Sequence, residues 1–189
     1  MRHVLFFLLF FLFSSQALAQ DFAPQVQTVV GAVQERTDHL ATRASTHLFW
    51  IPSDHAMVFV YAGVIYTVNK HFWIAPQTGA TINWNNEGDI SPLGAVWTRM
   101  SSKQMALFLD LELYPMQDDL VYYGYYNAEY AAAPWLGVGL QAEQVDLGLI
   151  AGLHLTFIPS EQITLGPEYY YDIEGEQHIL RWVMSITLK

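Results

Sequence analysis

The sequence contains no cysteine and few charged residues, and both shortages narrow the class of protein. Without cysteine, no disulfide can close the fold, so packing and backbone hydrogen bonds must do so alone. Charged residues make up only 14% of the chain, against roughly 25% in soluble proteins. Lys and Arg total 8 against 18 Asp and Glu, which gives a net charge of −10. With no basic stripe to neutralise phosphates, the chain is not expected to bind nucleic acid.

Long apolar runs are also scarce, and the clearest one lies at the N-terminus. It covers Val4 to Phe13, follows the basic start Met1-Arg2-His3 and precedes Ala17-Leu18-Ala19, the small-x-small pattern that a signal peptidase cuts. A membrane-spanning helix needs roughly 20 apolar residues, so this run is too short to be one. We therefore predict an exported chain whose signal peptide, residues 1–19, is cleaved after Ala19. No later run is long enough for such a helix, so a membrane-embedded form would have to be a β-barrel.

Apolar and aromatic residues, by contrast, are abundant. They account for 52% and 15% of the chain, and the expected mature chain of roughly 170 residues has the length of one domain. Such a composition is typical of strands that meet lipid with one face and carry aromatic side chains at their ends.

The residues after the expected cleavage site favour a helix. Val26, Val29, Val30, Val33 and Leu40 fall at helical spacing. We therefore predict an N-terminal amphipathic helix or leader over residues 20–45.

From about residue 46 onward, apolar residues recur at every second position. Residues 105–114 show this most clearly, because five apolar side chains share one face while Gln104, Asp110 and Glu112 share the other. The pattern marks nine strands, and the short run His47 to Ile51 is a candidate tenth. The nine are predicted at 56–68, 72–83, 92–100, 104–114, 120–129, 134–144, 147–157, 161–172 and 177–188.

Two hairpins allow the register of these strands to be predicted. A turn at Glu174-Gly175 places Glu168 opposite Arg181, Tyr169 opposite Leu180 and Leu165 opposite Met184. A turn at Val145-Asp146 places Ala142 opposite Leu149, Gly139 opposite Gly152 and Glu143 opposite Gly148. Both pairings keep apolar residues on one face, which favours an antiparallel meander.

The fold class indicated by these patterns is all-β: an antiparallel up-and-down barrel of 8 to 10 strands over residues 46–189, preceded by a short N-terminal helix. A barrel of this size has room for side chains but not for a wide channel. Inward-facing charges should then pair and fill the lumen. The predicted lumen network comprises Arg99, Asp110, Glu112, Glu143, His154, Glu168 and Arg181.

In these features the chain resembles small bacterial outer-membrane β-barrel proteins. The resemblance rests on the signal peptide, the alternating strands, the tyrosine-rich strand ends and a final strand that runs to the C-terminus. It departs from them at Ile186-Thr187-Leu188-Lys189, where such proteins usually end in an aromatic residue. The resemblance implies an outer-membrane location, outer-membrane lipid as the partner and a structural or envelope-interaction role.

Two other functions remain open. The helix-plus-barrel arrangement is similar to the lipid A palmitoyltransferase, and lipid A deacylases are small barrels too. A deacylase-type site needs a Ser nucleophile beside a His base; Ser160 is the nearest Ser to His154 and is expected at a turn, off the His154 face. The sequence therefore favours a role without catalysis over an enzymatic one. The third possibility is a soluble periplasmic lipocalin-like barrel that binds an apolar ligand inside. No cofactor, metal site or specific protein partner is predicted.

Overall fold

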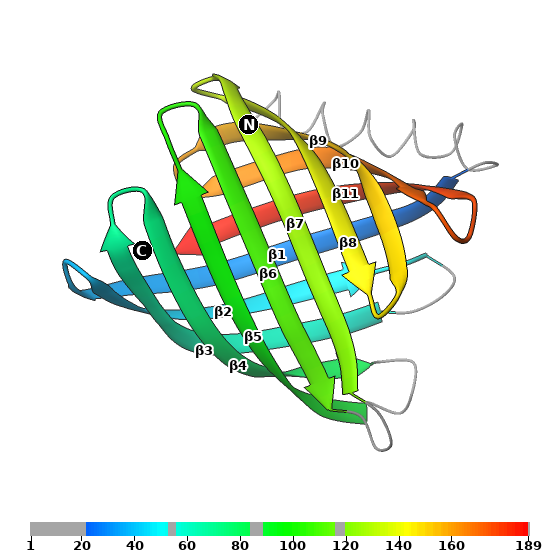
Figure 1. The fold of residues 1–189 in the computed structure, drawn as a ribbon, viewed down its shortest axis with the longest axis horizontal. Coiled ribbons are helices and arrows are strands. Elements are labelled where there is room, and N and C mark those ends of the chain that lie inside the picture. Colours follow the sequence, from blue (N-terminus) through cyan, green and yellow to red (C-terminus); the bar gives the residue numbers. More distant parts are fainter. Residues whose placement is uncertain (1–21, 53–55, 84–88, 116–119, 189) are drawn as a thin grey trace.

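Eleven strands close into a single barrel in a computed structural model that describes residues 22–52, 56–83, 89–115 and 120–188 (Figure 1). The strands are β1 (Phe22–Thr37), β2 (Leu40–Trp50), β3 (Ala56–Asn69), β4 (Phe72–Asn83), β5 (Asp89–Ser101), β6 (Met105–Pro115), β7 (Leu120–Ala133), β8 (Leu136–Val145), β9 (Gly148–Ser160), β10 (Ile163–Asp172) and β11 (Gln177–Leu188). The predicted signal peptide, residues 1–19, lies outside the described residues.

Each strand pairs antiparallel with the next, and β1 closes the barrel by pairing with β11. This last pairing is parallel, with Gln25 opposite Arg181. The all-β barrel is thus confirmed, but the predicted count of eight or ten strands is wrong. An odd number of alternating strands leaves the first and last pointing the same way, so a closed barrel must contain one parallel pair.

The predicted N-terminal helix is wrong, because residues 22–50 form β1 and β2 instead. The valines at helical spacing divide between two faces of a strand: Val26 and Val30 point outward, while Val29 and Val33 point inward. β-Branched residues favour strands, and Gly31 weakens a helix. Among the described residues there is no helix with the length and apolar character needed to cross a membrane.

The register predicted for the last hairpin is confirmed. Glu168 lies opposite Arg181, Tyr169 opposite Leu180 and Leu165 opposite Met184.

The register predicted for the β8–β9 hairpin is off by two residues. Ala142 lies opposite Ala151 instead of Leu149, because the turn is at Asp146-Leu147 instead of Val145-Asp146. Gly139 consequently faces His154, and Glu143 faces Ile150. Asp146 adopts a φ of 50°, which Asp tolerates and a β-branched valine avoids. A shift of two residues leaves every side chain on its predicted face.

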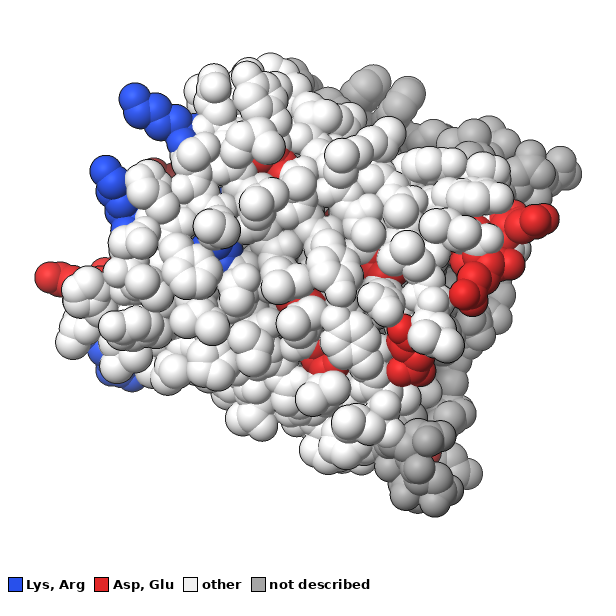
Figure 2. Space-filling model, in the orientation of Figure 1, with Lys and Arg blue, Asp and Glu red and all other residues white. Residues whose placement is uncertain are grey.

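The two faces of the barrel wall differ sharply in polarity. Inward positions hold most of the buried polar and charged side chains, among them Gln25, Asp110 and Glu112. Outward positions are mostly apolar, and many are exposed, as in Leu140 at 63% and Leu153 at 55% exposure. The centre of the molecule in Figure 2 is accordingly mostly uncharged surface.

The two ends of the barrel also differ, and we name them by their connections. The turn rim carries five connections of two or three residues: 38–39, 70–71, 102–104, 134–135 and 161–162. Backbone carbonyls of these turns accept hydrogen bonds from the neighbouring strand, for example His39 from Thr67 at 2.8 Å and Gln162 from Thr187 at 2.8 Å. The loop rim carries the connections 51–55, 84–88, 116–119, 146–147 and 173–176. In Figure 1 the turn rim lies at the left and the loop rim at the right.

Candidate functional site

The polar interior of the barrel is the candidate site, and Arg181 on β11 is the centre of its most connected cluster. Its guanidinium makes a two-point contact with Glu143 on β8: Nη1 donates to Oε1, and Nη2 donates to Oε2 at 3.2 Å. Arg181 Nε donates to Gln25 on β1 at 3.0 Å. Glu168 on β10 lies 3.6 Å from Nη1. One side chain thereby connects four strands, including both strands of the parallel pair.

Tyr170 completes this cluster from β10. Its hydroxyl lies 2.5 Å from Glu143 Oε1 and 3.0 Å from Glu168 Oε2, and it accepts from Arg181 Nη1 at 3.2 Å. Arg181 also lies over the rings of Phe49 and Tyr170, at 5.0 and 4.8 Å. Arg181 is 5% exposed and Glu143 7% exposed. Burial of charges at this depth is tolerated only when they are paired and hydrogen-bonded, as they are here.

A second cluster surrounds Glu112 on β6, the most deeply buried carboxyl group among the described residues at 2% exposure. Tyr61 on β3 donates to its Oε1 at 2.8 Å, and Tyr114 on the same strand as Glu112 donates to its Oε2. Asp110 lies two residues away on the same inward face of β6 and is 7% exposed.

Arg43 on β2 provides the positive charge on this side of the lumen. Its guanidinium lies over the ring of Trp97, 4.4 Å from the centroid, a cation–π geometry. The ring of His47 stacks on Trp97 with 5.7 Å between the centroids, and it lies 4.8 Å from the centroid of Tyr61. Rings from β2, β3, β5 and β6 therefore pack across this half of the interior.

A third cluster is centred on His154 of β9. Its Nε2 lies 3.3 Å from Glu129 Oε2 on β7, and Thr156 donates to the same oxygen at 2.6 Å. Asn127 Nδ2 lies 3.4 Å from His154 Nδ1. Gly139 makes room for the imidazole, because a Cβ there would collide with its Cε1.

The seven residues of the predicted lumen network therefore occupy different places. Glu143, Glu168 and Arg181 meet in one cluster, Asp110 and Glu112 share another, and His154 belongs to the third. Arg99 is exposed near the turn-rim end of β5, and its link to these clusters is a charge attraction to Glu129 of the third.

Ser160 does not form a nucleophile–base pair with His154. It was expected off the His154 face; it has the same parity on β9 but lies at the exposed end of that strand. Its Oγ accepts the backbone N–H of Gln162 at 3.3 Å. His154 contacts Glu129 and Asn127 instead.

Several interior residues were missed by the sequence analysis. Arg43, His47 and Gln25 were missed because they fall in or beside the segment interpreted as a helix. Glu129 and Tyr61 lie on predicted strands, and the parity of those strands would have identified both as inward-facing. The predicted lumen network was chosen from ionisable inward-facing residues. The tyrosines that donate hydrogen bonds to the carboxyl groups are uncharged and were therefore left out of it.

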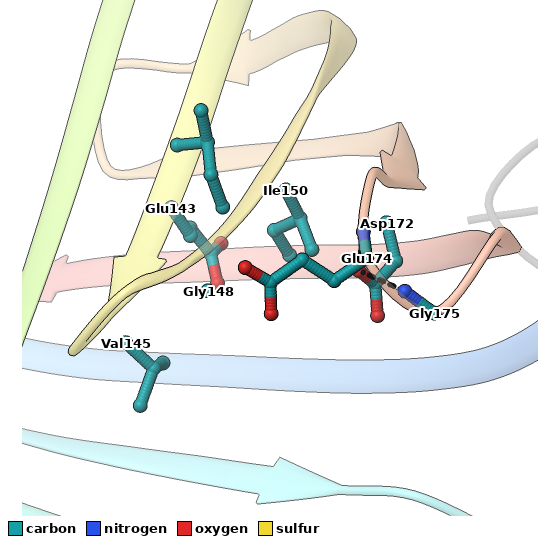
Figure 3. A pocket seen from close by; sticks show the side chains of 8 residues that line it. Glu143, Val145, Gly148, Ile150, Asp172, Glu174 and Gly175 are labelled. Atoms are coloured by element: carbon teal, nitrogen blue, oxygen red, sulfur yellow. Dashed lines mark hydrogen bonds between the residues drawn. The ribbon is translucent and has the colours of Figure 1, made fainter.

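A hollow of about 500 Å³ lies at the loop rim, beside the Arg181 cluster. Figure 3 shows the carboxylates of Glu143, Asp172 and Glu174 around it. Asp172 Oδ1 accepts the backbone N–H groups of Glu174 and Gly175, each at 3.0 Å, and so holds the β10–β11 turn. The Glu143 carboxylate therefore reaches from the buried cluster toward this mouth of the barrel.

Chemically, the interior is arranged for pairing and packing. Glu112, Glu129 and Glu143 have hydroxyl, imidazole or guanidinium partners, whereas Asp110 Oδ1 is buried without a hydrogen-bond partner. Aromatic rings fill the space between the clusters. No model of a known protein family matches the chain, and no curated protein matches it.

Proposed function

We propose that the protein is an integral outer-membrane β-barrel with a structural or envelope-interaction role and a lumen filled by its own side chains. The observation that carries this proposal is the polarity of the wall. Along the described strands, outward positions hold no Asp, Glu or Lys, and Arg36 near the turn-rim end of β1 is the one charged side chain among them. Water is a poor solvent for such a surface, whereas lipid tails are a good one.

Strand length supports the same proposal. The strands run from 10 to 16 residues, and a tilted transmembrane strand needs roughly 9 to 11. Each strand is therefore long enough to cross the hydrocarbon layer.

Exposed aromatic side chains near both ends of the strands add support. Trp50 and Tyr171 lie outward near the loop rim, while Tyr66, Tyr130 and Trp135 lie near the turn rim. Girdles of this kind are typical of membrane barrels, since amphipathic rings prefer the interface between lipid and water.

The strand count departs from bacterial single-chain barrels, which have even numbers of strands, but membrane barrels with odd numbers exist. A soluble eleven-stranded barrel is also a known architecture. The outward face argues against the soluble alternative, because such a barrel needs charged residues on its exterior.

The interior supports a role other than transport. The Arg181 and Glu112 clusters reach across the lumen from several strands, so the barrel has no room for a wide aqueous channel. Among the described residues, His154 has no Ser partner. Ser45 Oγ does lie 3.4 Å from His47 Nε2, but Ser45 is 4% exposed and His47 packs against Tyr61 and Trp97, so a lipid ester has no access to this pair. We therefore favour a scaffold or interaction role over transport or lipid editing.

Cell fractionation tests the proposal. We expect the protein in the outer-membrane fraction and expect its gel mobility to change on boiling, because a lipid-facing barrel stays folded in detergent until heated. Recovery in the soluble periplasmic extract, with the same mobility before and after boiling, would reject the membrane location.

A further inference from the structure

The parallel pairing of β1 with β11 places the beginning of β1 and the end of β11 at opposite rims of the barrel. β1 begins at the loop rim and β11 ends at the turn rim, because both run in the same direction. In Figure 1 both strands run from right to left. In any barrel that crosses a membrane, strands so arranged place the chain before β1 and the chain after β11 on opposite sides.

The connections indicate which side is which. All five turn-rim connections have two or three residues, whereas four of the five loop-rim connections have four or five. Outer-membrane barrels have short turns on the periplasmic side and longer loops on the outside. By the lengths of its connections, the turn rim corresponds to the periplasmic end of such a barrel, and the loop rim corresponds to its external end.

The distribution of charge makes the two rims chemically distinct surfaces. Among described residues, the loop rim carries only acidic charges and the turn rim carries all the Lys and Arg residues that lie outside the interior clusters (Figure 2). The acidic set is Asp89, Asp146, Asp172, Glu174 and Glu176, and the basic set is Arg36, Lys70, Arg99 and Lys103. The turn rim also carries Glu35, Asp38 and Glu161. Whichever rim faces outward thus decides the charge that the protein presents to the medium.

We propose that the acidic loop rim faces the cell exterior, so that β1 begins at the external surface and β11 ends on the periplasmic side. This inference rests on the proposed membrane location. It gives the protein an external surface that combines the hollow shown in Figure 3 with the beginning of β1.

Single cysteines test the arrangement cleanly, because the chain has none of its own. Glu174→Cys lies in a loop-rim connection and Lys103→Cys in a turn-rim connection, and both side chains are exposed. Asp21→Cys and Lys189→Cys mark the positions directly before β1 and directly after β11. The reagent is a maleimide joined to a polyethylene glycol chain too large for porins, applied to intact cells and to cells with a permeabilised outer membrane.

We expect the Asp21→Cys and Glu174→Cys variants to react in intact cells. The Lys103→Cys and Lys189→Cys variants should react only after permeabilisation. Each variant is also fractionated and tested for its heat-dependent gel shift, which shows that it is inserted and folded.

The contrary outcomes are distinct. Equal reactivity of Asp21→Cys and Lys189→Cys in inserted protein would overturn the separation of the chain ends. Reaction of Lys103→Cys and Lys189→Cys alone in intact cells would overturn the orientation while leaving the membrane barrel intact. A soluble protein whose four variants all react only after permeabilisation would overturn the proposed function as well.

Discussion

At the scale of single residues, the interior is stabilised by side chains that each contact residues of several strands. Arg181 contacts residues of β1, β8 and β10 from its place on β11. Glu112 receives hydroxyl groups from β3 and from its own strand. Gln25, Glu143 and Tyr61 are distant in sequence from the side chains that they contact, so these contacts cross-link the barrel independently of its backbone ladders.

Removal of Arg181 should therefore be costly. In Arg181→Ala, Glu143 and Glu168 would remain buried without their counter-charge, so we expect the free energy of unfolding to fall by about 3 to 5 kcal/mol. Denaturant titration in detergent or lipid bilayers measures this loss.

Arg99→Ala is the matched control, because Arg99 is exposed and has no part in the Arg181 cluster. Its effect should stay within about 0.5 kcal/mol. The double variant Arg181→Ala, Glu143→Ala should lose less than the sum of its single variants, since neither partner is then left alone. Equal losses for Arg181→Ala and Arg99→Ala would contradict the buried ion pair.

At the scale of secondary-structure elements, residues 56–188 were largely predictable from sequence. Each of those strands has an outward face that is mostly apolar, so the period of two is visible without a structure. In β1 the signal is weaker, because valines occupy both faces: Val29 and Val33 line the interior while Val26 and Val30 face outward. The sequence pattern of β1 thus matches a helix as well as a strand, and only pairing with β11 and β2 decides between them.

The candidate site was predictable to a similar degree. The register of the last hairpin correctly placed Glu168 opposite Arg181. It could not show that Glu143, from a different hairpin, supplies the carboxylate closer to Arg181. That contact depends on how the sheet curves and closes, which no local pattern encodes.

The β8–β9 turn depends on the backbone conformation of Asp146. This residue has a φ of 50°, and its carboxylate accepts the backbone N–H of Tyr122 at 3.0 Å. We expect Asp146→Val to lower the free energy of unfolding by about 1 to 2 kcal/mol, because valine resists this φ and offers no acceptor. Asp146→Asn should have little effect, since asparagine tolerates the φ and retains an oxygen. Thermal gel-shift midpoints compare the two variants, and equal midpoints would argue against the turn at Asp146-Leu147.

At the scale of the whole molecule, the apolar exterior is the feature on which the proposed membrane location rests. Leu140 is 63% exposed and points outward from the middle of β8. In lipid, Leu140→Arg should cost about 2 to 4 kcal/mol, the penalty for arginine near the bilayer midplane. In water, the same substitution at an exposed site should be nearly neutral.

Leu147→Arg is the control for this comparison. Leu147 is 90% exposed in the β8–β9 turn at the loop rim, so arginine there should be tolerated in either solvent. Unfolding titrations of both variants in lipid vesicles provide the measurement. Tolerance of arginine at both positions would speak for a soluble barrel.

The parallel pairing of β1 with β11 also restricts how this fold can be rearranged. In a barrel with an even number of strands, the chain ends meet at one rim, so a short linker can join them and the chain can be reopened at another loop. Here the same linker would have to traverse the full height of the barrel, either through an interior occupied by the Arg181 and Glu112 clusters or along the outer wall. Many folds tolerate circular permutation with a short linker, but this barrel should not, because a short linker cannot join its two chain ends.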